Sequence, residues 1–342
     1  MGSACLRKIT LACGLAMIGP ALSACDSADK PVAVIRIGTT PNDPLMLEVA
    51  RDKKILHLLF DTGSAGTVMD LDLAHRHLQP LSGSERLQHD GLPDTVGGLY
   101  GELPVTYFRS RPLRYQEWDI PQADITPAIS MSATAVALGR PVDGVIGMPA
   151  ISKQTWVWER QLGSLMGYRR LPPAFAGQPG GMSCTALGTS SSGTAVVRVE
   201  IAGKPSWFAL DTGYTGDLSG SLSRQDLDQL RALQQIGKEV VYRGTLGQDG
   251  APAGPRALAR VKDIVIAGHH FDGLAFQETD GASRFGLAFL HKLERALFDF
   301  AGERFCFTPP ATPMPDRLPS QQELDNRAAG KKLPAAGLQA VK

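Results

Sequence analysis

Residues 49–66, VARDKKILHLLFDTGSAG, and residues 199–216, VEIAGKPSWFALDTGYTG, align with each other without a gap. Each stretch runs from a mainly apolar, partly alternating segment into Asp-Thr-Gly. Alternation with β-branched and aromatic residues is typical of strands rather than helices. Each copy therefore predicts a strand, a turn and a return strand that leads into the motif. The expected strands are residues 45–50, 55–60, 195–201 and 206–210.

The composition argues against nucleic acid as a partner. The 342 residues carry a formal net charge of +1, which does not provide the basic surface that a phosphate backbone requires. Glycine (37 residues) and proline (24 residues) are frequent, and this favours short strands and turns over long helices. One helix is expected over residues 224–235, because Ser223 and Asp226 form a capping pattern and leucines follow at every third position.

The N-terminus, residues 1–24, has the pattern of an export signal. A basic start precedes an apolar run of about ten residues, which is too short to span a bilayer. The LSAC sequence that ends at Cys25 resembles a bacterial lipobox. This resemblance implies a lipoprotein anchored to a membrane of the bacterial cell envelope through lipid on Cys25, facing the periplasm, and Asp26 favours the inner membrane. The alternative is an ordinary secretory signal cleaved after Ala24.

Composition divides the chain into six expected segments. A stretch rich in glycine and proline separates the two copies and is expected to have little regular structure. A tail rich in proline, alanine and charge follows the second copy and is expected to be disordered. The segments are the signal peptide (1–24), a tether (25–30), an N-terminal lobe (31–158), a linker (159–185), a C-terminal lobe (186–308) and a disordered tail (309–342).

Cys184 and Cys306 flank the second copy of the repeat, and a disulfide between them is one interpretation. Disulfides persist in the compartments to which exported proteins go. The alternative is two separate buried thiols.

Two Asp-Thr-Gly motifs inside matching flanks are more specific than one, because a single copy often marks only a turn. The motifs occupy residues 61–63 and 211–213, and hydrophobic-hydrophobic-Gly elements follow at residues 143–147 and, in altered form, at residues 284–286. In these features the sequence resembles the aspartic peptidases, both pepsin-like and retropepsin-like. The resemblance implies an all-β fold of two lobes that arose by internal duplication.

The same resemblance implies that Asp61 and Asp211 are catalytic. Two adjacent carboxyl groups cannot both ionise cheaply, so one keeps its proton while the other is charged. The charged group takes a proton from a water that attacks the peptide carbonyl, and the neutral group donates a hydrogen bond to the developing oxyanion. The implied activity is that of an aspartic endopeptidase on a peptide or protein substrate, without a cofactor or metal. Because one chain carries both aspartates, a monomeric pseudo-dimer is expected.

Other residues of the motifs have implied supporting roles. Gly63 and Gly213 allow a sharp turn and a close approach of backbone N–H groups to the carboxylates. Thr62 and Thr212 are implied to hydrogen-bond across the lobe interface, which would hold the aspartates rigid. Ser64 matches the small or hydroxyl-bearing residue that follows the motif in the family.

Two positions depart from the family pattern. Tyr214 follows the second motif where the family has a small or hydroxyl-bearing residue, and Arg284 interrupts the second hydrophobic-hydrophobic-Gly element. Both leave open how Asp211 is hydrogen-bonded. Tyr214 also favours an alternative function, that of a peptide-binding lipoprotein that has the same fold but does not cut. The retention of Asp-Thr-Gly in both copies favours the peptidase.

Tyr100 is the candidate for a flap residue. It lies in the glycine-rich segment 97–101, which is either a hairpin that closes over the substrate or a solvent-exposed turn. The histidines show no metal-ligand spacing with a third ligand, and the sequence contains no Gly-x-Ser-x-Gly.

Overall fold

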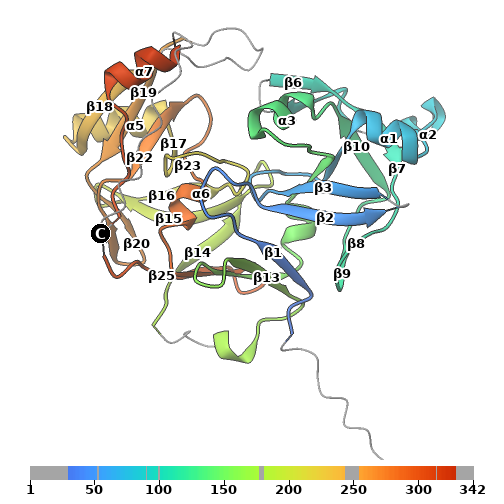
Figure 1. Cartoon of the computed structure of the whole chain (residues 1–342), viewed down its shortest axis with the longest axis horizontal. Helices are drawn as coiled ribbons and strands as arrows, with labels where there is room; N and C mark the ends of the chain where they lie inside the picture. Colours follow the sequence, from blue (N-terminus) through green and yellow to red (C-terminus); the bar gives the residue numbers. More distant parts are fainter. Residues whose placement is uncertain are drawn as a thin grey trace, which may run out of the picture.

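Most of the regular structure is β-strand. The strands form one sheet of 15 strands, one of six, and two hairpins of two strands each, and short helices accompany them (Figure 1). The all-β expectation is confirmed at this level. The computed structural model describes residues 30–51, 54–89, 91–98, 101–176, 181–242, 254–312 and 314–328.

The first Asp-Thr-Gly motif lies at the end of β3 in the six-stranded sheet. The predicted hairpin is present as β2 and β3, and β11 pairs in parallel with β3 directly before the motif. In sheet order the strands are β2 (Met46–Arg51), β3 (Lys54–Phe60), β11 (Gly144–Ile146), β4 (Val68–Asp70), β10 (Ile125–Ile129) and β7 (Thr106–Arg109).

The second motif lies at the end of β16, among strands that repeat this order. An antiparallel hairpin is followed by a parallel, an antiparallel, a parallel and an antiparallel pairing, as in the six-stranded sheet. The strands are β15 (Ala195–Ile201), β16 (Lys204–Leu210), β23 (Arg284–Phe285), β17 (Gly220–Ser223), β22 (Ala275–Thr279) and β19 (Arg256–Val261), followed by β18 (Ile236–Tyr242).

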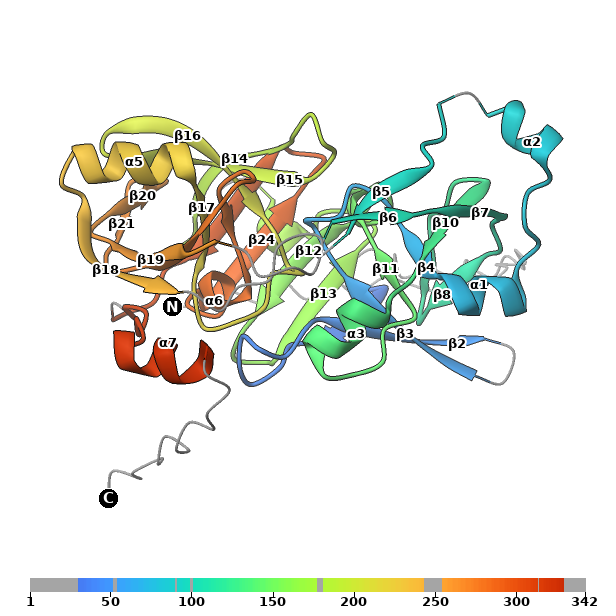
Figure 2. The same ribbon diagram turned by 90° about the horizontal axis from the view of Figure 1, so that it is seen from above.

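Six further strands connect the two regions. In Figures 1 and 2, β2 and β3 lie to one side of these central strands, and the strands around the second motif lie to the other. The six continue the 15-stranded sheet beyond β15, and they come from the start, the middle and the end of the described chain. In sheet order they are β1 (Ala33–Arg36), β13 (Ser164–Tyr168), β12 (Thr155–Glu159), β24 (Arg295–Asp299), β25 (Arg304–Thr308) and β14 (Ser183–Thr189).

The remaining elements are short. Two hairpins, β5–β6 and β8–β9, stand apart from the large sheets, and β20–β21 is attached to β15. These strands are β5 (Thr95–Gly98), β6 (Gly101–Pro104), β8 (Leu113–Tyr115), β9 (Trp118–Ile120), β20 (Ile264–Ile266) and β21 (His269–Phe271). The helices are α1 (Leu71–His77), α2 (Gly83–Leu87), α3 (Ser132–Leu138), α4 (Met148–Ile151), the 3-10 helix η2 (Pro173–Phe175), α5 (Arg224–Ala232), α6 (Leu287–Leu290) and α7 (Gln321–Ala328).

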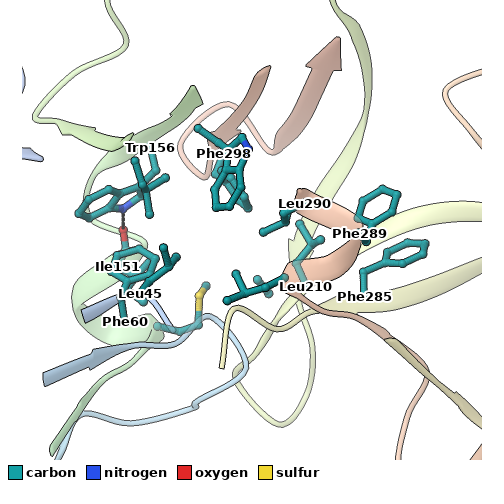
Figure 3. Close-up of a cluster of buried hydrophobic side chains, with 14 of the residues drawn as sticks. Leu45, Phe60, Ile151, Trp156, Leu210, Phe285, Phe289, Leu290 and Phe298 are labelled. Atoms are coloured by element: carbon teal, nitrogen blue, oxygen red, sulfur yellow. Dashed lines mark hydrogen bonds between the residues drawn. The ribbon is translucent and has the colours of Figure 1, made fainter. Parts of the chain in front are cut away.

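A continuous hydrophobic core lies directly beneath both motifs. Phe60 and Leu210, the residues that precede the two aspartates, are buried and belong to the same cluster (Figure 3). Trp156 of β12 packs edge-to-face on Phe60, and its indole N–H donates to the carbonyl of Ile151 (2.9 Å), so that this large side chain is fully satisfied. The strands that lead into both motifs therefore share one packed core.

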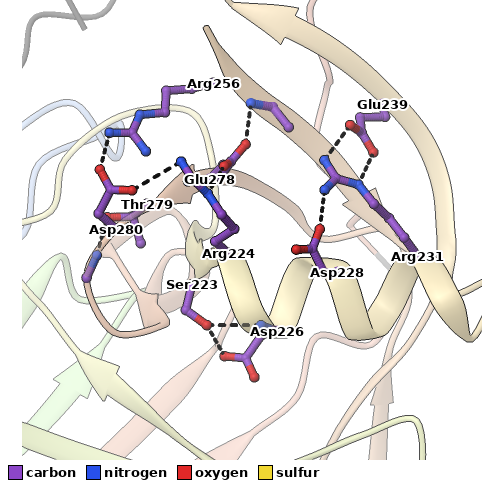
Figure 4. Close-up of polar contacts among 12 residues, drawn as sticks. Ser223, Arg224, Asp226, Asp228, Arg231, Glu239, Arg256, Glu278, Thr279 and Asp280 are labelled. Carbon is purple, nitrogen blue, oxygen red and sulfur yellow. Dashed lines mark hydrogen bonds and ion pairs between the residues drawn. The ribbon is translucent and has the colours of Figure 1, made fainter. Parts of the chain in front are cut away.

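Helix α5 begins where the capping pattern predicts. The hydroxyl of Ser223 accepts the N–H of Asp226 (3.1 Å) and donates to the Asp226 carboxylate (2.8 Å; Figure 4). The helix ends at Ala232 rather than at residue 235, because the backbone at Gln234 turns into the left-handed region with φ of 56°.

Cys184 of β14 and Cys306 of β25 form a disulfide, which confirms one of the two interpretations of these cysteines. The two residues lie directly opposite each other on neighbouring strands of the central region. The bond closes a loop between residues 122 positions apart, and this loop contains the second motif.

Loss of this disulfide should destabilise the protein. A cross-link across a long loop restricts the unfolded chain, and its removal typically costs about 2–5 kcal/mol of the free energy of unfolding. We expect a loss in this range for the Cys184→Ala/Cys306→Ala double variant in urea unfolding. Wild-type protein that is unfolded in the presence of a thiol reductant should show a similar loss. Equal stability of the oxidised wild type and the double variant would contradict this expectation.

Two expectations about regular structure are wrong. The linker 159–185 contains β13, because its residues find antiparallel partners in β1 and β12, which lie elsewhere in the sequence. The tail 309–342 is ordered over part of its length, where Leu318 and Leu324 are buried and α7 packs against β18. In both segments, partners distant in sequence supply the burial that local composition does not predict.

Candidate active site

The two Asp-Thr-Gly turns are built in the same way and face each other. The N–H of Asp61 donates to the carbonyl of Ile146 on β11 (3.0 Å), and the N–H of Asp211 donates to Phe285 on β23 (2.9 Å). Each aspartate is thus fixed where its own strand ends, against the parallel strand beside it.

Reciprocal hydrogen bonds of the two threonines connect the motifs. The N–H of Thr62 donates to the Thr212 hydroxyl oxygen (3.0 Å), and the N–H of Thr212 donates to that of Thr62 (3.1 Å). The Thr62 hydroxyl donates to the carbonyl of Leu210 (2.5 Å), and the Thr212 hydroxyl donates to that of Phe60 (2.9 Å). Both side chains are buried. The predicted bonding between Thr62 and Thr212 is confirmed, and each hydroxyl both donates and accepts a hydrogen bond.

The glycines bring the two carboxyl groups into contact. The N–H groups of Gly63 (2.7 Å) and Gly213 (3.2 Å) both donate to Oδ1 of Asp61. A Cβ at Gly63 would lie 2.4 Å from Cγ of Asp211, and one at Gly213 would lie 2.6 Å from Cγ of Asp61. Each glycine therefore leaves the space that the carboxyl group of the other motif occupies, and a side chain there would separate the pair.

Burial and the neighbouring negative charge act together on Asp61. Burial of the carboxyl group is the larger cause and the charge of Asp211 the next, and together they raise the pKa of Asp61 well above its usual range. The N–H groups of Gly63 and Gly213 oppose this rise without cancelling it. The geometry thus favours a pair that holds one proton, which is the state that acid–base chemistry on a bound water requires.

Arg284 contacts the other carboxyl group. Its Nη1 donates to Oδ2 of Asp211 (2.7 Å), and the Asp211 side chain is only 9% exposed. The sequence showed Arg284 only as a break in a hydrophobic pattern. Ala209 pairs in parallel with Arg284, and this pairing places the Arg284 side chain beside Asp211, two residues after Ala209. The contact could have been predicted only from the register of this strand pair.

Tyr214 does not disturb the hydrogen bonding of Asp211. Its backbone N–H donates to Oδ1 of Asp211 (2.9 Å), and its hydroxyl donates to the carbonyl of Gly220 (3.2 Å). Burial raises the pKa of the Tyr214 hydroxyl to about 12, so that it stays a neutral donor. Ser64 acts within its own turn, because its hydroxyl donates to the carbonyl of Gly66 (2.8 Å).

A cavity of about 580 Å³ opens beside Tyr214. Leu218, Tyr242 and Leu258 give it apolar walls, while Asp217 and Gln277 contribute polar atoms. Another wall is formed by the C-terminal segment, through Arg317, Pro319, Glu323 and Leu324. The cavity is lined by the residues that directly follow the second motif, whereas Asp61 and Asp211 do not line it.

Two predicted residues lie outside the described part of the chain, namely Tyr100 and Cys25. The strands that flank Tyr100 pair as an antiparallel hairpin, with Gly98 opposite Gly101. Among the described residues, no three His, Cys, Asp or Glu side chains are grouped as metal ligands. No helix of the described ranges is both long and apolar enough to cross a bilayer. No protein-family model matches the chain, and no curated protein does so either.

Proposed function

We propose that this chain is an aspartic endopeptidase of the two-lobed, pepsin-like kind, formed by internal duplication. The observation that carries the proposal is the contact between the carboxyl groups of Asp61 and Asp211, held by reciprocal threonine hydrogen bonds. The repeated strand order around the two motifs supports a duplicated origin. The burial beneath both turns provides the rigidity that a catalytic pair needs.

The reaction that this pair supports is hydrolysis by a water activated between the carboxyl groups. The ionised carboxylate takes a proton from the water as its oxygen bonds to the peptide carbonyl carbon, and the protonated carboxyl gives its proton to the carbonyl oxygen. The carbon–nitrogen bond then breaks. The nitrogen receives the proton taken from water, and the other carboxyl recovers its own from a hydroxyl of the intermediate. Atoms and charges balance over one water and one peptide bond.

The setting that we propose follows the N-terminal sequence. Lipid on Cys25 would hold the protein at a bacterial envelope membrane, facing the periplasm, where peptides or proteins are its substrates. One chain supplies both aspartates, so a monomer suffices for the reaction.

Incubation of the protein with a mixed peptide library tests whether it cleaves peptide bonds. The soluble chain 26–342 is incubated from acid to neutral pH, the products are identified by mass spectrometry, and an Asp61→Asn/Asp211→Asn double variant serves as the blank. We expect cuts that the blank does not make. Identical products from both proteins would assign the cleavage to a contaminant. If folded wild-type protein binds peptides but makes no cuts at any pH, the peptide-binding alternative replaces the proposal. The ion pair that restrains Asp211 is the observation in favour of that alternative.

A further inference from the structure

The two halves of the proposed pair have different surroundings at a single matched position. Val145 on β11 pairs with Leu59, two residues before Asp61, and Arg284 on β23 pairs with Ala209, two residues before Asp211. Val145 and Arg284 each stand two residues before a glycine, Gly147 or Gly286. The same place in the two sheets therefore holds an apolar side chain on the Asp61 side and a cation on the Asp211 side.

The ionisable groups that face the pair come from three elements. Arg284 approaches from β23, and Tyr214 lies in the turn after the second motif with its hydroxyl directed to Gly220. Ser283, which precedes Arg284 in the chain, donates its hydroxyl to the carboxylate of Asp226 on α5, and that carboxylate also accepts from the Ser223 hydroxyl. Within the described chain, Arg284 is thus the cation that contacts the pair, and it does so through Asp211.

We propose that Arg284 makes the two aspartates chemically unequal, holding Asp211 as the ionised base and leaving the shared proton on Asp61. An ion pair requires the carboxylate form, and a cation 2.7 Å from one of two touching carboxyl groups stabilises the anion on that group. The inference rests on the proposed function, since it assigns roles within that reaction. It makes Arg284 a positioning residue, because it acts through Asp211.

The cation should also determine the pH range of activity. A positive charge stabilises the ionised forms of the pair, so each proton leaves at a lower pH than it would without the charge. Replacing Arg284 by a neutral residue should therefore move both limbs of the pH profile towards higher pH. The acidic limb should move further, because it reports ionisation of the group in direct contact. About one to two pH units is the expected shift, because an adjacent opposite charge typically has this effect and Arg284 is one-third exposed.

Four proteins test the inference: the wild type, Arg284→Gln, Arg284→Lys and the control Arg224→Gln. Arg224 is exposed on α5, where it pairs with Glu278 and Asp280 (Figure 4). The measurement is kcat/KM for one peptide between pH 2 and pH 9. We expect the upward shift for Arg284→Gln, a smaller one for Arg284→Lys because it keeps the charge, and none for Arg224→Gln. A folded Arg284→Gln protein with the wild-type profile overturns the inference.

A second readout does not depend on activity. The carboxyl carbons of ¹³C-labelled aspartates are titrated by NMR in the wild type and in Arg284→Gln, with Asp61→Asn and Asp211→Asn used to assign the two signals. In the wild type, the Asp211 signal should titrate at lower pH than the Asp61 signal, and both should move upward in Arg284→Gln. If no peptide is cut but this pattern is seen, the inference holds while the proposed activity fails. If Asp61 titrates before Asp211, the assignment is wrong.

Discussion

Replacing either aspartate of the proposed pair with asparagine should reduce kcat/KM for a cleaved peptide severely, and by more at Asp211 than at Asp61. Asparagine at position 211 removes the proposed base and places a neutral amide against Arg284, so we expect a loss of about 10³- to 10⁴-fold. Asparagine at position 61 can still donate a hydrogen bond to the oxyanion but cannot transfer its proton, and a loss of about 10²- to 10³-fold is expected. The double variant should be little worse than Asp211→Asn, because residues that act as a unit are not additive.

The control for these variants is Asp228→Asn, which changes an exposed carboxylate on α5 whose partner is Arg231. It should leave kcat/KM unchanged. Equal losses in the two single variants would contradict unequal roles for Asp61 and Asp211, whereas retention of activity in either one would contradict the catalytic pair itself.

The second large expected effect is a loss of stability when Asp316 in the C-terminal segment is replaced. Asp316 is buried and forms an ion pair with the buried Lys292 (2.6 Å), and its Oδ2 accepts the N–H groups of Ser219 (3.2 Å) and Ala275 (2.6 Å). Asp316→Ala leaves a buried ammonium without its counter-charge and takes an acceptor from two N–H groups, of which that of Ser219 keeps the carbonyl of Ala275 (2.9 Å). Removal of one partner of a buried pair typically costs about 3–5 kcal/mol, and we expect urea unfolding to show a loss of this size.

Two further proteins make this measurement specific. Asp228→Ala removes one partner of an exposed pair and should cost at most about 1 kcal/mol. Lys292→Met combined with Asp316→Leu removes both buried charges and should recover part of the loss seen with Asp316→Ala. If Asp316→Ala unfolds at the same urea concentration as Asp228→Ala, the C-terminal segment does not contribute to the stability of the fold.

Local sequence patterns predicted the hairpins and the motifs because these features depend on neighbours in the chain. Strands β2, β3, β15 and β16 lie within one or two residues of the expected ranges, since alternation and turn residues determine them. The hydrogen bond between Thr62 and Thr212 could be predicted from the resemblance to aspartic peptidases, because the two motifs match residue for residue.

The features that the sequence did not show depend on pairing between distant residues. In β13, Gly167 has no propensity for strand, yet it is needed because a Cβ there would lie 2.6 Å from the ring of Trp156 on the neighbouring strand. The sequence contains Arg284, but its contact with Asp211 depends on the register of β23 beside β16. Register of this kind is set by the whole sheet and not by any single segment.

The central sheet can form only after most of the chain has been synthesised, because its strands come from distant parts of the sequence. β1 near the start pairs with β13, β12 pairs with β24, and β25 near the end pairs with β14. A nascent polypeptide that has not yet reached residue 308 lacks the strand that completes this sheet. Contacts between such distant residues also slow folding relative to a helical protein. The proposed cutting activity is therefore withheld during synthesis, and fragments released before completion should be inert towards the proteins around them.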